Sequence, residues 1–148
     1  MKKLTLVLFL VVVAILGGAL QDKLKTTTLH FNTLTFIDNE TQEVVERRVG
    51  NIDFMVVNDE FRHIRLIDND KKEDNINIYW IIGPPEKEEF KNGSTSMVYT
   101  AFSEKDDIPC IIVIPESEKY VILYVEAETI VIENLKVSEE IIQDRKIN

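Results

Sequence analysis

Cysteine is nearly absent from this chain, because Cys110 is the only one among 148 residues. A single cysteine cannot form an internal disulfide, so the core must hold the fold, and a domain of about 130 residues can bury an adequate core. No cysteine lies directly after the N-terminal apolar segment, and we expect no lipid anchor there. Cys110 lies in the apolar run Ile108–Ile114, which predicts a small buried side chain.

Glycine and histidine are also scarce, with five glycines and two histidines. The glycines are isolated, so no glycine-rich loop can bind phosphate, and the motifs of serine and cysteine nucleophiles are missing. His30 and His63 lack zinc-ligand spacing, and we expect surface or rim side chains, with a pair across adjacent strands as the alternative. Two carboxylates could still catalyse without leaving a motif. The sequence favours a non-catalytic protein that uses no metal and no other cofactor.

Basic residues are outnumbered, with 17 Lys and Arg against 26 Asp and Glu and a formal net charge of −9. Nucleic acids and anionic membranes attract clusters of Lys and Arg, so neither is an expected partner. The acidic segment Asp68–Asn75 lacks the glycine and the final glutamate of an EF-hand calcium loop. It also contains two lysines, and we expect a solvated connection between strands.

The first feature that the chain does contain is an N-terminal targeting signature. Lys2 and Lys3 precede the apolar run Leu4–Leu16. Gly17–Ala19 then supply the small side chains that a signal peptidase requires at its cleavage site. We expect residues 1–19 to be a cleaved signal peptide and the protein to be secreted or periplasmic. An uncleaved segment would instead be a membrane anchor, although a spanning helix needs about 20 apolar residues.

From Thr26 onward the periodicity is that of β-strands, in short segments rich in Ile, Val, Thr, Tyr and Phe. The predicted strands are 28–37, 43–49, 52–57, 61–67, 75–82, 95–103, 108–114, 119–126 and 129–137. Short connections make sequence neighbours antiparallel neighbours. The sequence therefore predicts one all-β domain over residues 20–148, an antiparallel meander of about eight or nine strands that forms a sandwich or a barrel.

Three details complete this prediction. The ordered core covers about residues 26–137, and Ser138–Asn148 forms a short C-terminal helix or a tail. The charged segment Glu86–Gly93 holds at most one helical turn. In the strand over residues 75–82, alternation places Ile76, Ile78, Trp80 and Ile82 on one face, which we expect to be the buried one.

Aromatic side chains gather in three of the predicted strands. If those strands adjoin, they form one aromatic face, which usually packs in a core but can instead bind a ligand or line a barrel. The candidate binding residues are Tyr79, Trp80, Tyr99, Tyr120 and Tyr124.

Two functions fit these observations. The first is a non-catalytic module that binds a protein partner through a strand edge or an exposed aromatic face. The alternative is a small barrel that carries an apolar molecule, which a cavity of about 300 Å³ or more would support. Asn39 and Asn92 head Asn-x-Ser/Thr sequons in predicted loops, so both are candidate N-glycosylation sites in a host that glycosylates.

Overall fold

The computed structural model describes residues 25–58 and 60–136, and its regular elements are all β-strands. The nine strands are β1 (Lys25–Asp38), β2 (Val44–Asn58), β3 (His63–Asp68), β4 (Ile76–Ile81), β5 (Glu86–Glu89), β6 (Thr95–Ser103), β7 (Ile108–Pro115), β8 (Tyr120–Val125) and β9 (Glu128–Glu133). The predicted signal peptide and the predicted C-terminal helix or tail lie outside the described residues. Within residues 25–58 and 60–136, no helix is long and apolar enough to cross a bilayer.

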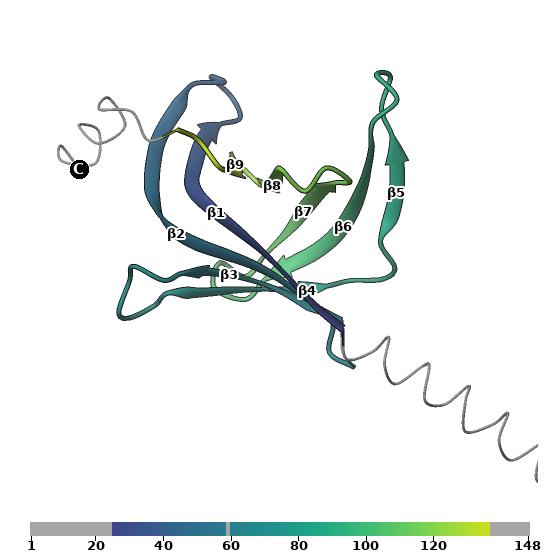
Figure 1. Cartoon of the computed structure of the whole chain (residues 1–148), viewed down its shortest axis with the longest axis horizontal. Coiled ribbons are helices and arrows are strands. Elements are labelled where there is room, and N and C mark those ends of the chain that lie inside the picture. Colours follow the sequence, from purple (N-terminus) through teal and green to yellow (C-terminus); the bar gives the residue numbers. More distant parts are fainter. Residues whose placement is uncertain (1–24, 59, 137–148) are drawn as a thin grey trace, which may run out of the picture.

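The strands form one antiparallel sheet that closes on itself as a barrel (Figure 1). The sheet order is β4-β3-β2-β1-β9-β8-β7-β6-β5, and an additional pairing of β4 with β6 closes the ring. Eight strands make this ring, while β5 is an extra strand on β6. The predicted all-β meander is therefore confirmed, and of the two predicted architectures the chain adopts the barrel.

The strands β4 and β5 pair with successive parts of β6, β4 with its C-terminal end and β5 with its N-terminal end. Gly83, at a φ of 72°, and the prolines 84 and 85 separate the two strands. Proline cannot donate to a β-ladder, so the strand must end here. The prediction of a helical turn in Glu86–Gly93 is wrong, because β6 extends beyond the end of β4 and offers its edge to β5.

Strand β2 is continuous where the sequence predicts two strands separated at Gly50 and Asn51. A Cβ atom at position 50 would lie 2.8 Å from Oδ2 of Asp70. The same oxygen accepts a hydrogen bond from the backbone N–H of Asn51 at 3.0 Å. Gly50 therefore permits the close approach of a carboxylate to the strand rather than a turn.

Alternate residues of the ring strands point inward and fill the middle of the barrel. Phe54, Ile64, Ile112 and Leu123, from four different strands, are all 0% exposed. Cys110 is buried in the same core, as the sequence predicts. The hollows described below lie toward the two ends of the barrel, on either side of this core.

The alternation predicted for β4 is correct, but the face assigned to the core is wrong. Tyr79 is 4% exposed, whereas Ile76 and Trp80 are 47% and 38% exposed. On the outer face, Trp80 Nε1–H donates to Glu104 at 2.9 Å and the indole lies 5.2 Å from the ring of His63. The register of β4 between β3 and β6 turns Tyr79 inward and gives the polar edge of Trp80 a partner at the surface.

Candidate functional site

The hollow at one end of the barrel, called here the Asn77 recess, has a volume of about 190 Å³. Its floor is made of inward-facing apolar side chains, namely Leu34, Phe36, Ile52, Leu66, Val125 and Ile130. These residues come from β1, β2, β3, β8 and β9, so the recess lies inside the ring of strands.

Strand β4 contributes two polar groups to this recess, Asn77 and Tyr79. The Oδ1 atom of Asn77 is buried and accepts no hydrogen bond from the described residues. Burial raises the pKa of the Tyr79 hydroxyl, and neighbouring Cys110 and Asp106 raise it further. A buried polar atom without a partner is uncommon in a folded protein.

Arg48 forms one wall of the recess and is held by two contacts. Its Nε–H and Nη2–H donate to the two carboxylate oxygens of Glu46 at 2.5 and 3.0 Å. Its guanidinium lies 4.8 Å from the ring centre of Phe36. The hydrogen bond from Arg48 lowers the pKa of Glu46, so this pair stays charged and its charges largely compensate each other.

The rest of the rim carries both signs of charge. The cations are Lys71 and Lys105, and the carboxylates are Asp68, Asp74, Asp106 and Glu128. Asp106 is positioned by Ser103, whose hydroxyl donates to its Oδ2 at 3.2 Å and accepts from its backbone N–H at 3.3 Å.

Cys110 lies in the core of the barrel, and its chemistry provides a test of the interior. Burial, followed by the charge of Asp106, raises the pKa of its thiol from 9.0 to about 11. At pH 8 the folded protein then holds about 100-fold less thiolate than an ordinary cysteine. We expect alkylation of Cys110 by iodoacetamide to be at least that much slower in buffer than in 8 M urea. Native and unfolded rates within about tenfold of each other would contradict this burial.

The same raised pKa makes stability depend on alkaline pH. The unfolded chain loses the thiol proton near pH 9.0 and the folded chain only near pH 11, so the contribution of Cys110 to stability is complete below pH 9 and is lost as the pH rises to about 11. Urea unfolding at pH 8, 9, 10 and 11 measures this loss. A Cys110→Ala variant should lose less stability over that window.

The opposite end of the barrel holds a second hollow, called here the Tyr99 groove. It consists of two adjoining spaces of about 250 and 230 Å³ that share Thr27, Val56 and Tyr99. One space also contacts Arg62, and the other contacts Glu116. The groove is open where β1 extends beyond the end of β9, because β9 pairs with β1 only from Thr33 onward.

The five aromatic residues predicted to bind a ligand do not share one face. Tyr79 lines the Asn77 recess and Tyr99 lines the groove at the other end. Trp80, Tyr120 and Tyr124 are exposed on the outside of the barrel. The sequence reasoning missed Asn77 and Asp106, for which the only signal was an amide between two isoleucines and a carboxylate in a charged turn.

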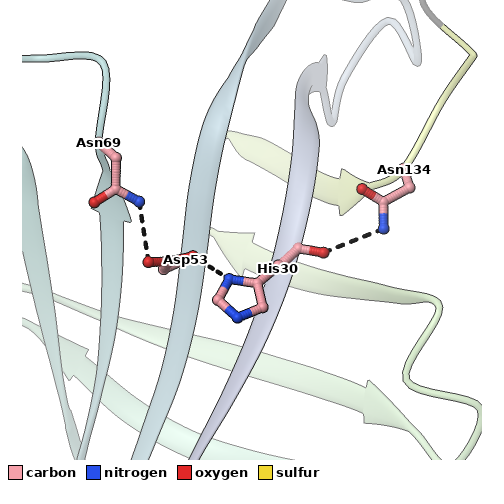
Figure 2. Close-up of polar contacts among 4 residues, drawn as sticks. All are labelled: His30, Asp53, Asn69 and Asn134. Atoms are coloured by element: carbon pink, nitrogen blue, oxygen red, sulfur yellow. Dashed lines mark hydrogen bonds and ion pairs between the residues drawn. The ribbon is translucent and has the colours of Figure 1, made fainter.

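His30 lies on the outer face of β1, opposite Asp53 on β2 (Figure 2). An ionised carboxylate only accepts, so His30 Nδ1–H donates to Asp53 Oδ1, at 2.5 Å. Asn69 donates to Asp53 Oδ2 at 3.0 Å, and Asn134 donates to the carbonyl of His30 at 3.1 Å. A histidine oriented by a carboxylate resembles a general base, but this pair lines neither the Asn77 recess nor the Tyr99 groove. We interpret it as a cross-strand link.

His63 is 5% exposed, so the prediction of a surface or rim side chain is wrong for this residue. Its Nδ1–H donates to the carbonyl of Phe61 at 2.6 Å, and its Nε2 accepts from Arg65 Nε–H at 2.9 Å. Both bonds together require a neutral imidazole. The alternative of a His30–His63 pair is also wrong, because β2 lies between β1 and β3.

Both sequons lie in turns, and Asn39 and Asn92 differ in their surroundings. The side chain of Asn39 donates to the carbonyl of Glu126 at 3.0 Å and accepts from Thr129 Oγ1–H at 2.5 Å. Asn92 is exposed in the turn between β5 and β6 and accepts only from Ser94. A glycan at Asn39 would disturb contacts with the barrel, so Asn92 is the more accessible site.

Among residues 25–58 and 60–136, no three His, Cys, Asp or Glu side chains are grouped to hold a metal ion. In comparisons with known proteins, no family model, no curated protein and no solved structure matches this chain.

Proposed function

We propose that this protein binds a compact small molecule in the Asn77 recess, without transforming it. The carrying observation is the recess itself, in which apolar side chains from five strands meet the polar residues Asn77 and Tyr79 of β4. Small eight-stranded barrels can hold one small ligand at their mouths. Ligand sites are typically apolar hollows with a few converging polar groups, and this recess has that composition.

The size of the recess narrows the class of ligand. At about 190 Å³ it is smaller than the roughly 300 Å³ from which typical ligand pockets begin, so a bulky apolar cargo is disfavoured. An apolar cavity of about 150 Å³ is known to admit benzene. A molecule of one ring with a short polar chain fits this space.

A protein partner on the exposed aromatic residues is the weaker alternative. Trp80 is already bonded to Glu104 and stacked near His63. Trp80 lies on β4, whereas Tyr120 and Tyr124 lie on β8, and β6 and β7 separate these two strands. No single aromatic surface unites these residues, whereas the recess gathers its polar and apolar groups in one place.

A screen of one-ring fragments by ligand-observed NMR tests the proposal. Ile130→Phe fills the recess and should abolish binding, whereas Ile114→Phe fills the Tyr99 groove instead and should leave it unchanged. If both variants bind equally, or if only Ile114→Phe loses binding, the recess is not the site.

Replacing Asn77 with leucine should raise the free energy of unfolding by about 1 kcal/mol, because it removes a buried acceptor that has no donor. The same change should weaken fragment binding. Asn77→Asp, which places a charge at the same point, should lower stability. Urea denaturation measures both effects, and a clear loss of stability in Asn77→Leu would show that the amide is already paired.

We also propose that the protein is exported and that residues 1–19 are removed. Mass spectrometry of protein purified from its native host should find a mature chain that begins at Leu20. A chain that retains Met1 and fractionates with membranes would contradict cleavage. The same spectra report any glycan on Asn39 or Asn92 and any small molecule that co-purifies.

A further inference from the structure

We infer that the free edge of β1 binds an extended peptide, which adds a strand beside β1 and places alternate side chains in the Tyr99 groove. This site lies at the opposite end of the barrel from the Asn77 recess and is independent of the function proposed there. Three features support the inference, namely a row of unpaired backbone groups, an edge without charge, and an apolar groove whose two spaces carry opposite charges.

The first feature is the direction of the backbone groups on β1. Strand β9 pairs with β1 only from Thr33 onward, so the N-terminal part of β1 extends beyond it (Figure 1). Asn134, just after β9, donates to the carbonyl of His30, so the backbone groups of His30 point to the side of β9. In an antiparallel ladder those of every second residue point the same way. Thr26 and Thr28 therefore direct their N–H and C=O to this side, where no backbone group of the described residues pairs with them.

The second feature is the composition of this edge, compared with two other free edges of the sheet. Proteins commonly protect a free edge with charged residues, proline or a covering loop, because its unpaired groups would otherwise recruit another chain. All residues of β5, Glu86–Glu89, are charged, and the part of β2 that β3 leaves unpaired contains the charged run Glu46–Arg48. Residues 26–31 of β1 contain no Asp, Glu, Lys, Arg, Pro or Gly. This edge is therefore left open to pairing.

The third feature is the Tyr99 groove, which lies along the inner side of this edge. Thr27 and Leu29 face inward from β1 and line the groove together with Met97 and Ile114. A strand added to β1 would direct every second side chain to the same face as Thr27 and Leu29. A peptide with apolar side chains at alternate positions would therefore bury them in the groove, while its backbone pairs with β1.

The two spaces of the groove differ in charge. The first contacts Arg62, and it also contacts Asn58, which pairs with the first residue of β1. The second contacts Leu29, farther along β1, and has two carboxylates among its lining residues, Glu116 and Glu118. The groove is therefore positive where β1 begins and negative farther along the strand.

This order of charges identifies the occupant and its direction. A peptide antiparallel to β1 places its C-terminal carboxylate beside Arg62 and its N-terminal part beside Glu118. Glu116 is already paired with Lys87 at 3.1 Å, so Glu118 is the carboxylate that a basic residue would contact. The fitting ligand has a basic N-terminal part, alternating apolar residues and a free C-terminal carboxylate. The β1 edge of a second copy fits less well, because residues 26–31 offer no charge to Arg62 or Glu118.

The test is an NMR titration of the ¹⁵N-labelled protein with a synthetic hexapeptide. The peptide has lysine at its first two positions, valine at the third and fifth, threonine at the fourth and sixth, and a free carboxylate. In the antiparallel register the two valines lie opposite Leu29 and Thr27 and face the groove. We expect saturable binding that shifts the amide signals of Thr26 and Thr28. Absence of saturable binding would overturn the inference and leave the proposal for the Asn77 recess untouched.

Two methylated peptides test whether the ligand pairs as a strand. The fourth residue of the peptide lies opposite Thr28, and the two residues exchange both backbone hydrogen bonds. N-methylation of this residue should therefore weaken binding about tenfold. N-methylation of the fifth residue is the control, because its N–H points away from β1, and binding should hardly change. Equal losses for the two peptides would contradict strand pairing.

Matched protein variants locate the charge and the groove. Arg62→Gln should weaken binding about three- to tenfold and remove the preference for a free carboxylate over a C-terminal amide. Arg47→Gln is the control, because it removes the same charge from a residue that does not line the groove. Ile114→Phe should block the peptide and Ile130→Phe should not, the reverse of their effects on fragments in the recess. Equal effects within either pair of variants would overturn the site.

Two further measurements examine other occupants of the edge. Thr28→Pro removes an N–H that points away from β2, so the ladder of β1 and β2 stays intact. We expect the protein to sediment as a monomer with or without this change, and the variant to bind the hexapeptide about tenfold more weakly. A dimer that Thr28→Pro dissociates would assign the edge to a second copy. A synthetic peptide of residues 137–148 that binds more tightly than the hexapeptide would assign it to the chain's own C-terminal segment. Either result would overturn the inference.

Discussion

Replacing Phe54 with alanine is expected to lower the free energy of unfolding by about 3–5 kcal/mol. Phe54 is 0% exposed and lies on β2, the strand between β1 and β3. Its direct neighbours across the two ladders are Leu29 and Leu66, so the truncated side chain would leave a cavity that they cannot readily fill. Small domains are stable by only about 5–15 kcal/mol, and this one substitution would remove a large share.

Urea denaturation followed by tryptophan fluorescence measures this loss, because Trp80 is the only tryptophan. Phe90→Ala is the matched control, since Phe90 is 45% exposed and should change stability by less than about 0.5 kcal/mol. If Phe54→Ala does not fold, Phe54→Leu provides an intermediate loss that can still be measured. Equal effects at positions 54 and 90 would contradict the described core.

The second large effect concerns the seam where the barrel closes. β4 and β6 meet over only three residue pairs, and Ala101, opposite Ile81, is 0% exposed. A large side chain at this position has no space inside the barrel. We expect Ala101→Phe to lower stability by about 1–3 kcal/mol, and by more if it separates the two strands.

Thr100→Phe is the control for this prediction, because Thr100 is the adjacent residue of the same strand and is exposed on the outer face. Side chains alternate between the two faces of a strand, so these variants differ in face but hardly in position. We expect Thr100→Phe to stay within about 0.5 kcal/mol of the wild type. A reversed order of the two effects would show that β6 is paired one residue out of register.

The seam between β4 and β6 also supports the Asn77 recess. Its floor and its polar groups come from strands on both sides of the seam, so opening the seam would displace Tyr79 and Asn77 on β4 from the residues on β8 and β9. Ala101→Phe should therefore weaken fragment binding along with stability, whereas Phe90→Ala should affect neither.

Much of the strand content followed from the sequence because period-two alternation is a local property. The segments Thr95–Ser103 and Ile108–Ile114 were predicted nearly to the residue. Glu86–Glu89 was missed, since four charged residues in a row have no apolar alternation. That strand forms because β6 is longer than β4, which depends on how distant segments pair.

Which face of each strand points into the barrel was less predictable from the sequence. In β4, apolar residues alternate with Asn77 and Tyr79, as the sequence predicts. Hydrophobicity alone, however, assigned the wrong face of this strand to the interior. The register against β3 and β6 decides the side, and that register is set by residues far away in the chain. Trp80 can remain on the outer face because Glu104 accepts a hydrogen bond from its indole N–H.

The candidate site shows the same division. The sequence by itself determined that the domain is β-rich, acidic and without an internal disulfide, and its N-terminal pattern predicts export, because these properties reside in composition and in short segments. Only the tertiary structure decided that the sheet closes into a barrel, that the Oδ1 atom of Asn77 is buried without a donor, and that Asp106 and Tyr79 line one recess. Each of these depends on strand pairing between distant segments, in which a shift of one residue would exchange the inner and outer faces.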